Sequence, residues 1–491
     1  MAISKQETET AQTESRYGKR RYVGRSETLG YILCDFAQSF SIGKYSNRFI
    51  WDVVKIDFNI AGTVNLFSGA WDIINDTLIG AAVDRTRTRW GKFRPYLLSI
   101  KLPLTVFGLL YWFMPLFFPD TSATYMPKLI FYFAFTIINE TASTFTEISQ
   151  TGLLSTITPN PDERLLLITK ANFWSRFIGE KLPEMAFGVF LDLINKKVVN
   201  WKLSSLFIGM GTVTSILAAA ATFYFYFVSK ERVMQTIERP SIKQGLKAII
   251  NNKPMLIIVL SSFLSGFSIS QSRSDYYIDV LGSASLQTIV GIPAYPVLNG
   301  SYAFVAPLKR RFSTKALWIA EDFYTDMCWL IVFAIGSFGG NFKKRAVMIP
   351  VMAIEEFVEM WVYGVRHVIP NELYNESMDY CEWVNGYRME AMTGVARSLI
   401  LKIQSVVISS VKNFVLAGIG YEQGKTIGTQ TDRAKWWLFA LGTGIPIITS
   451  ALGIVPKFFY PLSADKREKM YAELFERRQQ YASDYVTSVE T

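Results

Sequence analysis

The sequence predicts an all-α membrane protein that crosses the bilayer twelve times, in two halves of six helices each. Half of its 491 residues are hydrophobic and only 19% are charged, whereas soluble proteins usually carry about a quarter. The hydrophobic residues gather in runs of about 20, the helix length that crosses a hydrocarbon core of roughly 30 Å. The run Leu206–Val228 contains no charged residue. Because soluble helices are rarely apolar around their whole circumference, these runs indicate membrane spans.

Turn and charge signals divide the apolar runs into spans that form two similar halves. The first half has expected spans at 27–52, 58–83, 96–118, 127–157, 166–195 and 203–229. The second half has them at 254–281, 285–307, 316–340, 346–371, 391–420 and 435–459. The basic loop after the second span recurs at the same place in each half, as parallel repeats would leave it. The expected domains are a tail (1–26), an N-terminal bundle (27–229), a linker (230–253), a C-terminal bundle (254–460) and a tail with an amphipathic helix (461–491).

The basic residues lie between the apolar runs. They cluster at Lys19–Arg25, Arg85–Arg94, Lys230–Lys253 and Lys309–Lys315. Because cytoplasmic loops are enriched in Lys and Arg, this pattern places both termini in the cytoplasm and explains the net charge of +10 without a nucleic-acid partner. We therefore expect a multi-pass protein of the cell membrane. Three scattered cysteines and a single histidine predict neither a disulfide framework nor a metal site.

The second expected span carries two acids well inside the hydrocarbon. Asp72 and Asp76 are four residues apart, so they project from one helix face about 5–6 Å from each other, with Asn75 on the same turn. Acids in a span usually face a cavity and mark an ion or proton path, and snorkelling to water from a span end is the weaker alternative here. Thr144 and Glu147 in the fourth span add a hydroxyl and a third acid. These oxygens together predict a site for a hard cation or a proton.

The block WDIINDTLIG followed by DRTRTRWGKFRPY, within Phe67–Tyr96, resembles the glycoside–pentoside–hexuronide:cation symporters of the major facilitator superfamily. Two further family-like blocks are Met378–Gln404 and Leu153–Thr158. The resemblance implies the major facilitator fold, in which two pseudosymmetric six-helix bundles alternate access to a central cavity. It also implies a cation site made of Asp72, Asn75, Asp76, Thr144 and Glu147. Glu147 stands where the melibiose carrier of this family has an aspartate, a change that could favour protons over sodium.

At the sugar-binding positions of the melibiose carrier, the sequence departs from the family pattern. Ser39 replaces an acid on the first span, and Asn172 replaces an arginine on the fifth. Thr151 replaces a tryptophan on the fourth span, whereas a lysine is kept at Lys402. The resemblance therefore argues against a melibiose-like galactoside and leaves the sugar unnamed.

Two arginines within spans are further candidates for substrate binding. Arg176 lies in the fifth expected span and Arg273 in the seventh. A guanidinium can hold a carboxylate with two parallel hydrogen bonds, so either residue could bind an anionic sugar such as a uronide. The alternative is a structural ion pair for each arginine. Arg176 would then pair with Glu180, and Arg273 with Asp275 or with a glutamate of the tenth span (Glu355, Glu356 or Glu359).

The arginine-rich loop after the second span has a separate expected role. The resemblance implies that arginines such as Arg85, Arg89 and Arg94 bridge to helix ends and lock the cytoplasmic side in the outward-open state. The alternative is that their charge only fixes the topology of the chain.

The sequence thus predicts a secondary transporter that carries a sugar or glycoside, including oligosaccharides and uronides, together with Na⁺ or H⁺. We expect it to work as a monomer in membrane lipid, without a cofactor. One alternative is a cation-coupled carrier of lysolipids or other organic solutes with the same fold, although a lysolipid would need an apolar side cleft. Another is a non-transporting sensor, which would have no reason to keep costly buried acids. The sequence contains no nucleophile–base arrangement of the kind that would indicate an enzyme.

Overall fold

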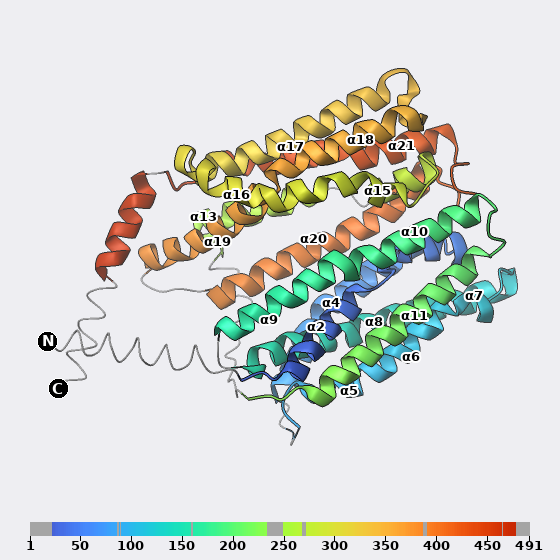
Figure 1. Cartoon of the computed structure of the whole chain (residues 1–491), viewed down its shortest axis with the longest axis horizontal. Coiled ribbons are helices and arrows are strands. Elements are labelled where there is room, and N and C mark those ends of the chain that lie inside the picture. Colours follow the sequence, from blue (N-terminus) through green and yellow to red (C-terminus); the bar gives the residue numbers. More distant parts are fainter. Residues whose placement is uncertain are drawn as a thin grey trace. The chain divides into compact units, whose positions relative to one another are not determined.

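The computed structural model describes residues 22–85, 88, 90–158, 161–232, 249–267, 272–385, 390–463 and 465–477 (Figure 1). These residues are mostly helical and divide into two compact units, one formed by residues up to 237 and the other by residues from 238 onward. The short segment Glu422–Thr426 groups with the first unit.

The first unit contains ten α-helices and three segments of 3₁₀- or π-helix within its described residues. In chain order they are α2 (Arg25–Ser39), η1 (Gly43–Tyr45), α3 (Ser46–Arg48), η2 (Phe49–Val54), α4 (Phe58–Arg85), α5 (Arg94–Ser99), α6 (Lys101–Trp112), α7 (Met114–Phe117), α8 (Ser122–Ile157), α9 (Pro161–Trp174), η3 (Ser175–Glu180), α10 (Lys181–Asn195) and α11 (Leu203–Val228).

The second unit has its own set of helices within the described residues. In chain order they are α13 (Lys253–Ser265), α14 (Ser272–Asp275), η4 (Tyr276–Val280), α15 (Leu286–Gly291), η5 (Ile292–Ala294), α16 (Tyr295–Arg311), α17 (Thr314–Ser337), η6 (Phe338–Lys343), α18 (Arg345–Glu359), η7 (Met360–Val362), α19 (Tyr363–Asn385), α20 (Glu390–Gly418), α21 (Asp432–Thr443) and α22 (Ile445–Phe458).

Part of the expected set of spans can be recognised by length and composition. Five described helices are long and apolar enough to cross a membrane, and the bent pair Leu286–Leu298 and Gly300–Arg311 would make a sixth. The fifth expected span is one continuous helical run, in which the π-helical segment η3 joins α9 to α10. The number twelve therefore stays a prediction.

The first expected span, 27–52, is interrupted. Helix α2 ends at Ser39, and Phe40 leaves the helical conformation with φ −74° and ψ 73°. Ser41 Oγ then accepts a hydrogen bond from the Gly43 N–H at 3.0 Å. Serine side chains can replace helical hydrogen bonds in this way, which favours a turn over a continued helix. The chain resumes as short helical segments that reach Val54.

Aromatic packing fixes the second part of this interrupted span. The Phe49 ring is fully buried and lies 5.1 Å from the Tyr111 ring, 5.0 Å from the Trp112 ring and 5.2 Å from the Phe207 ring, measured between centroids. Tilted and edge-on aromatic contacts of this kind add stability beyond the area they bury. The segment is thereby held against α6 and α11, and polar residues just before it border the cavity described below.

The helix at 465–477 differs from what its sequence suggests. Charges spaced as Lys469, Glu473 and Arg477 favour a solvated or membrane-surface helix. In the structure, Met470 and Leu474 are buried in a hydrophobic core that includes residues of α16, α17 and α19. Apolar residues on one helix face therefore dock the tail onto the second unit.

Candidate functional site

The Thr144 hydroxyl on α8 lies between the two acids of α4. Its Oγ1 atom is 3.3 Å from Asp72 Oδ1 and 3.1 Å from Asp76 Oδ1. Asp72 and Thr144 are buried, and Asp76 is half-buried. A hydroxyl carries one proton, so Thr144 can donate to only one of these carboxylates at a time. Two acids brought this close favour a bound cation or a shared proton.

The other two residues of the expected cation site occupy different positions. Asn75 is buried beside the acids, and its Nδ2 atom has no hydrogen-bond partner within the described part of the chain. Glu147 is exposed and lines the neighbouring cavity. The structure thus brings Asp72, Asp76 and Thr144 into contact and places Glu147 at the cavity wall.

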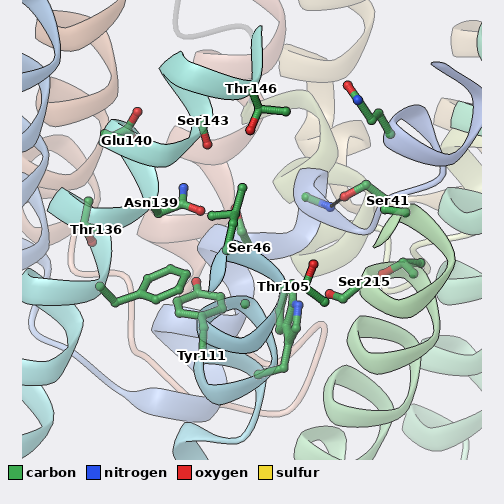
Figure 2. A pocket seen from close by; sticks show the side chains of 18 of the residues that line it. Ser41, Ser46, Thr105, Tyr111, Thr136, Asn139, Glu140, Ser143, Thr146 and Ser215 are labelled. Carbon is green, nitrogen blue, oxygen red and sulfur yellow. Dashed lines mark hydrogen bonds between the residues drawn. The ribbon is translucent and has the colours of Figure 1, made fainter. Parts of the chain in front are cut away.

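A cavity of 820 Å³ lies within the first unit, bordered by α2, η1, α3, α4, α6, α8 and α11. Its lining is rich in hydroxyl and amide groups, and Lys101 is the only cation among the described lining residues. Figure 2 shows the labelled polar side chains gathered around this space: Ser41, Ser46, Thr105, Tyr111, Thr136, Asn139, Glu140, Ser143, Thr146 and Ser215. Pockets of this volume hold ligands the size of small organic molecules, and this one offers mainly polar groups to bind them.

One face of α8 supplies much of the polar wall. Its lining residues recur every three or four positions: Thr136, Asn139, Glu140, Ser143, Thr146, Glu147 and Gln150. That spacing places them along one helix face. The stripe is visible in the sequence as polar residues at helical period within an apolar span, although only Glu147 was singled out from it as a candidate.

Two of the residues expected to bind substrate, Ser39 and Asn172, do not line the cavity. Ser39 is the last residue of α2 and packs against Gly179 of η3, since a Cβ at Gly179 would lie 3.3 Å from Ser39 Cβ. Asn172 is exposed on α9. The side chains of Thr151 and Arg176 lie outside the described residues, so their expected roles stay predictions.

A further acid lies in the same region and was missed by the sequence comparison. Asp35, one helical turn before Ser39 on α2, accepts a hydrogen bond from Ser175 Oγ of η3. The sequence signal that could have identified Asp35 is an acid within the largely apolar run YILCDFAQSFSIG of the first span. The first span therefore retains a carboxylate that contacts the fifth, one turn away from the position where the family has its acid.

The two candidates of the second unit lie in different surroundings. Arg273 stacks on the Trp329 ring, with Cζ 3.6 Å from the centroid, and its Nη1 lies 3.9 Å from Glu356 Oε1. Asp275 instead pairs with Lys412 at 2.9 Å. Two structural partners were expected for Arg273, namely Asp275 or a glutamate of the tenth span. The structure shows the ion pair with the glutamate. Lys402 is half-buried on α20.

The arginine-rich loop is described in part. Arg94 Nη2 donates to the Tyr226 carbonyl at 2.9 Å, near the end of α11. The Glu231 carboxylate accepts backbone N–H bonds from Lys92, Phe93 and Arg94 at 2.8, 2.8 and 2.9 Å, and so caps the start of α5. The Arg85 side chain and Arg89 lie outside the described residues, and the gating role of all three arginines stays a prediction.

The capping carboxylate also explains a glycine in the same loop. Gly91 has φ +113°, and a Cβ there would lie 2.4 Å from Glu231 Oε1. A side chain at this position would be strained and would displace the cap. The glycine of the WGKFRP block thus lets the loop close onto Glu231.

Comparisons with known proteins agree with this architecture. The profile of the family described as MFS/sugar transport protein matches residues 29–464. The chain is 26% identical to the isoprimeverose transporter of Lactiplantibacillus pentosus, over 93% of this chain and 92% of the transporter. It is 24% identical to the glucuronide carrier protein homolog of Escherichia coli strain K12, over 93% and 97% respectively.

A solved structure gives the same fold. The xylose transporter of E. coli in an inward-open conformation matches with a TM-score of 0.52 and 13% identity, over 91% of this chain and 98% of the transporter. At this identity the match supports the fold alone.

Proposed function

Because the chain belongs to the MFS/sugar transport protein family, we propose that it moves a sugar or glycoside across the membrane together with a cation. Family membership makes it a multi-pass membrane transporter with the major facilitator fold, and not an enzyme. Relatives named for isoprimeverose and for glucuronide, aligned over nearly their whole length, support sugars or glycosides as the substrate class.

The contact that carries the proposal is the Thr144 hydroxyl between the Asp72 and Asp76 carboxylates. In the proposed cycle a monovalent cation binds these three residues and neutralises the acids. Asn75 contributes through its amide, because no described residue holds the amide nitrogen and the group can turn its oxygen toward the ion. Carboxylate, hydroxyl and amide oxygens suit a hard cation, and the two acids can equally share a proton.

The proposed sugar site is the polar cavity of the first unit. Hydroxyl and amide groups such as Ser46, Asn139 and Ser143 offer hydrogen bonds to sugar hydroxyls, and Tyr111 offers an apolar ring face (Figure 2). Lys101 would attract the carboxylate of a uronide. Glu147 lines the cavity three residues after Thr144. Its carboxylate would therefore interact with a bound sugar and with the charge of a cation bound at the acid pair.

Further parts of the proposal concern location and assembly. Basic loops favour an orientation with both termini in the cytoplasm and insertion in the cell membrane. The proposed active form is the monomer, since the acid pair and the cavity both lie within one unit of one chain.

Uptake into proteoliposomes tests the proposal. Labelled xylosides, glucuronides and neutral disaccharides would be supplied while sodium and proton gradients are imposed separately. The proposal expects at least one sugar to accumulate under one of the two gradients and not in their absence. Flux of lysolipids with no flux of any sugar would contradict it, as would the absence of solute flux under every gradient.

A further inference from the structure

A second group of buried charges lies in the second unit, on other helices than the one that carries the acid pair. Helices α17 and α18 run side by side there (Figure 1), and α14 and α19 contribute to the same group. Its members are Arg273 and Arg366 with the four glutamates Glu321, Glu355, Glu356 and Glu359. Four acids face two arginines, so full ionisation would leave a buried excess of negative charge, which is costly within a membrane span.

Arg366 compensates two of the four acids. Its Nε lies 2.6 Å from Glu321 Oε1, and its Nη1 lies 2.8 Å from Glu359 Oε1. The second oxygen of Glu359 accepts a hydrogen bond from Trp329 Nε1 at 3.3 Å. Glu359 is therefore held as a carboxylate on both of its oxygens.

A third acid, Glu356, has Arg273 as its counterion at 3.9 Å. Both side chains are about one-fifth exposed, at 22% and 23%. The Arg273–Glu356 pair is therefore partly exposed to solvent.

Glu355 is the acid without a counterion in this arrangement. It is 4% exposed, and no N–H or O–H group of the described residues donates to either carboxyl oxygen, whereas the Glu359 carboxyl lies within hydrogen-bonding reach. It precedes Glu359 by one helical turn, so the two carboxyls lie on the same face of α18. An ionised Glu355 would be a buried charge without compensation, beside a second negative charge.

The ionisable groups near Glu355 come from α14, η4, α17 and α18 itself. On α17, Asp322 pairs with Lys457, Tyr324 donates its hydroxyl to the Val358 carbonyl, and Asp326 lies near Asp322, Lys457 and Arg366. Glu359, Glu356 and Arg273 act on it electrostatically. Glu355 in turn acts on Tyr277 of η4 and Cys328 of α17. The sequences of α15, η5 and η7, which also pack against α18, contain no ionisable group, and Lys343 of η6 pairs with Asp432 at 2.6 Å. Tyr277 Oη is buried without a partner in the described chain.

We propose that Glu355 is a proton-binding site of the second unit, protonated while Glu359 stays ionised against Arg366. A protonated Glu355 carries no charge and can donate its proton to the Glu359 carboxylate or to Tyr277 Oη. A proton needs a single acceptor, whereas a sodium ion needs a shell of several oxygens. Each oxygen of Glu359 already accepts from one partner, Arg366 or Trp329, and a carboxylate oxygen can accept one further hydrogen bond. This leaves room for the proton of Glu355 but few free oxygens for a sodium shell, so the geometry favours the proton.

Loss of this proton would redistribute the nearby charges. An ionised Glu355 would compete with Glu356 for Arg273, which is partly exposed and lies in α14, a different helix from either acid. Protonation of Glu355 would thus determine whether Glu355 or Glu356 pairs with Arg273, and through Arg273 which acid of α18 anchors the seventh expected span. This consequence for transport rests on the proposed function, whereas the protonation of Glu355 does not.

Infrared spectroscopy of the purified protein tests the protonation directly, because a protonated carboxyl has a C=O stretching band that a carboxylate lacks. Glu355→Gln should remove one such band at neutral pH. Glu372→Gln on α19, whose carboxylate pairs with Lys309 and Arg467, is the control and should remove none. An unchanged band in Glu355→Gln would overturn the proposal. Failure of Glu355→Gln to fold would also contradict it, because glutamine is neutral and close in shape to the protonated acid.

Transport assays test the consequence. In Glu355→Gln, exchange of labelled for unlabelled sugar should persist, while the dependence of net uptake on external pH seen in the unchanged protein should be lost. Retention of the full pH dependence would overturn the proposed role in transport. If the unchanged protein carried no sugar at all, the proposed function would fail, and the infrared test would still decide whether Glu355 holds a proton.

Discussion

Neutralising Asp76 should weaken cation binding severely while leaving the cavity intact. Asp76→Asn preserves the shape of the side chain and removes one of the two charges beside Thr144. Because Asp76 does not line the cavity, sugar binding itself should change little. The expected phenotype is therefore loss of accumulation with retained exchange of sugar across the membrane.

The distances in the site set the magnitude. The Oδ1 atoms of Asp72 and Asp76 are at most about 6.4 Å apart, the sum of the 3.3 and 3.1 Å distances to Thr144 Oγ1. A monovalent cation between them therefore lies within about 4 Å of each carboxylate, where one charge pair contributes about 4 kcal/mol at an effective dielectric constant of about 20. Since about 1.4 kcal/mol corresponds to a factor of ten, losing one carboxylate should weaken cation affinity about a thousandfold.

The assay is sugar uptake in proteoliposomes as a function of cation concentration, with exchange measured in parallel. Asp57→Asn is a matched control, because Asp57 is an exposed acid just before α4 whose Oδ1 accepts the Asn59 N–H, a role that an amide oxygen can keep. The control should retain the cation dependence of the unchanged protein. If Asp76→Asn also retained it and still accumulated sugar, the assignment of the acid pair as the coupling site would be refuted.

Three smaller perturbations follow from other contacts. Thr144→Val should raise the cation concentration for half-maximal uptake about ten- to a hundredfold, since a hydroxyl contact with a charged group is worth about 1.5–3 kcal/mol. Thr144→Ser keeps the hydroxyl and should leave this concentration unchanged. Glu231→Ala should lower the free energy of unfolding by about 2–3 kcal/mol, measured by thermal denaturation in detergent, because three backbone N–H groups lose their acceptor; an unchanged Tm would contradict the cap. Gly364→Ala should destabilise by about 1–3 kcal/mol, because its Cβ would lie 2.8 Å from the Ser301 backbone. Gly300→Ala on α16, with nothing within 4 Å, is its control and should not lower Tm.

Several features of the site were predictable from local sequence rules. The spacing of Asp72 and Asp76 requires a shared helix face, and the structure has both on α4 next to Thr144. The apolar runs and basic loops likewise predicted a helical membrane protein, which family membership confirms. These rules depend only on residues close in sequence, so no tertiary information was needed.

Other features depended on contacts that no local pattern encodes. Thr144 and Glu147 are three residues apart on α8, yet of these two only Thr144 contacts the acid pair of α4. The packing of α4 against α8 determines which side chains of α8 face α4 and which face the cavity. Glu231 caps α5 from a position more than 130 residues away in sequence. The break after Ser39 is a different case, because the Ser41 hydroxyl accepts the Gly43 N–H within the turn, a local contact that helical periodicity alone does not reveal.

The two acid groups allow a test of whether the two units bind their cation or proton independently. The acid pair of α4 contacts the Thr144 hydroxyl, whereas Glu355 lies beside an acid already held by Arg366. If each group binds its cation or proton through its own surroundings, Asp76→Asn should leave the infrared acid band of Glu355 unchanged, and Glu355→Gln should leave the cation concentration for half-maximal uptake unchanged. Loss of the Glu355 band in Asp76→Asn would show instead that the two groups titrate as one coupled system.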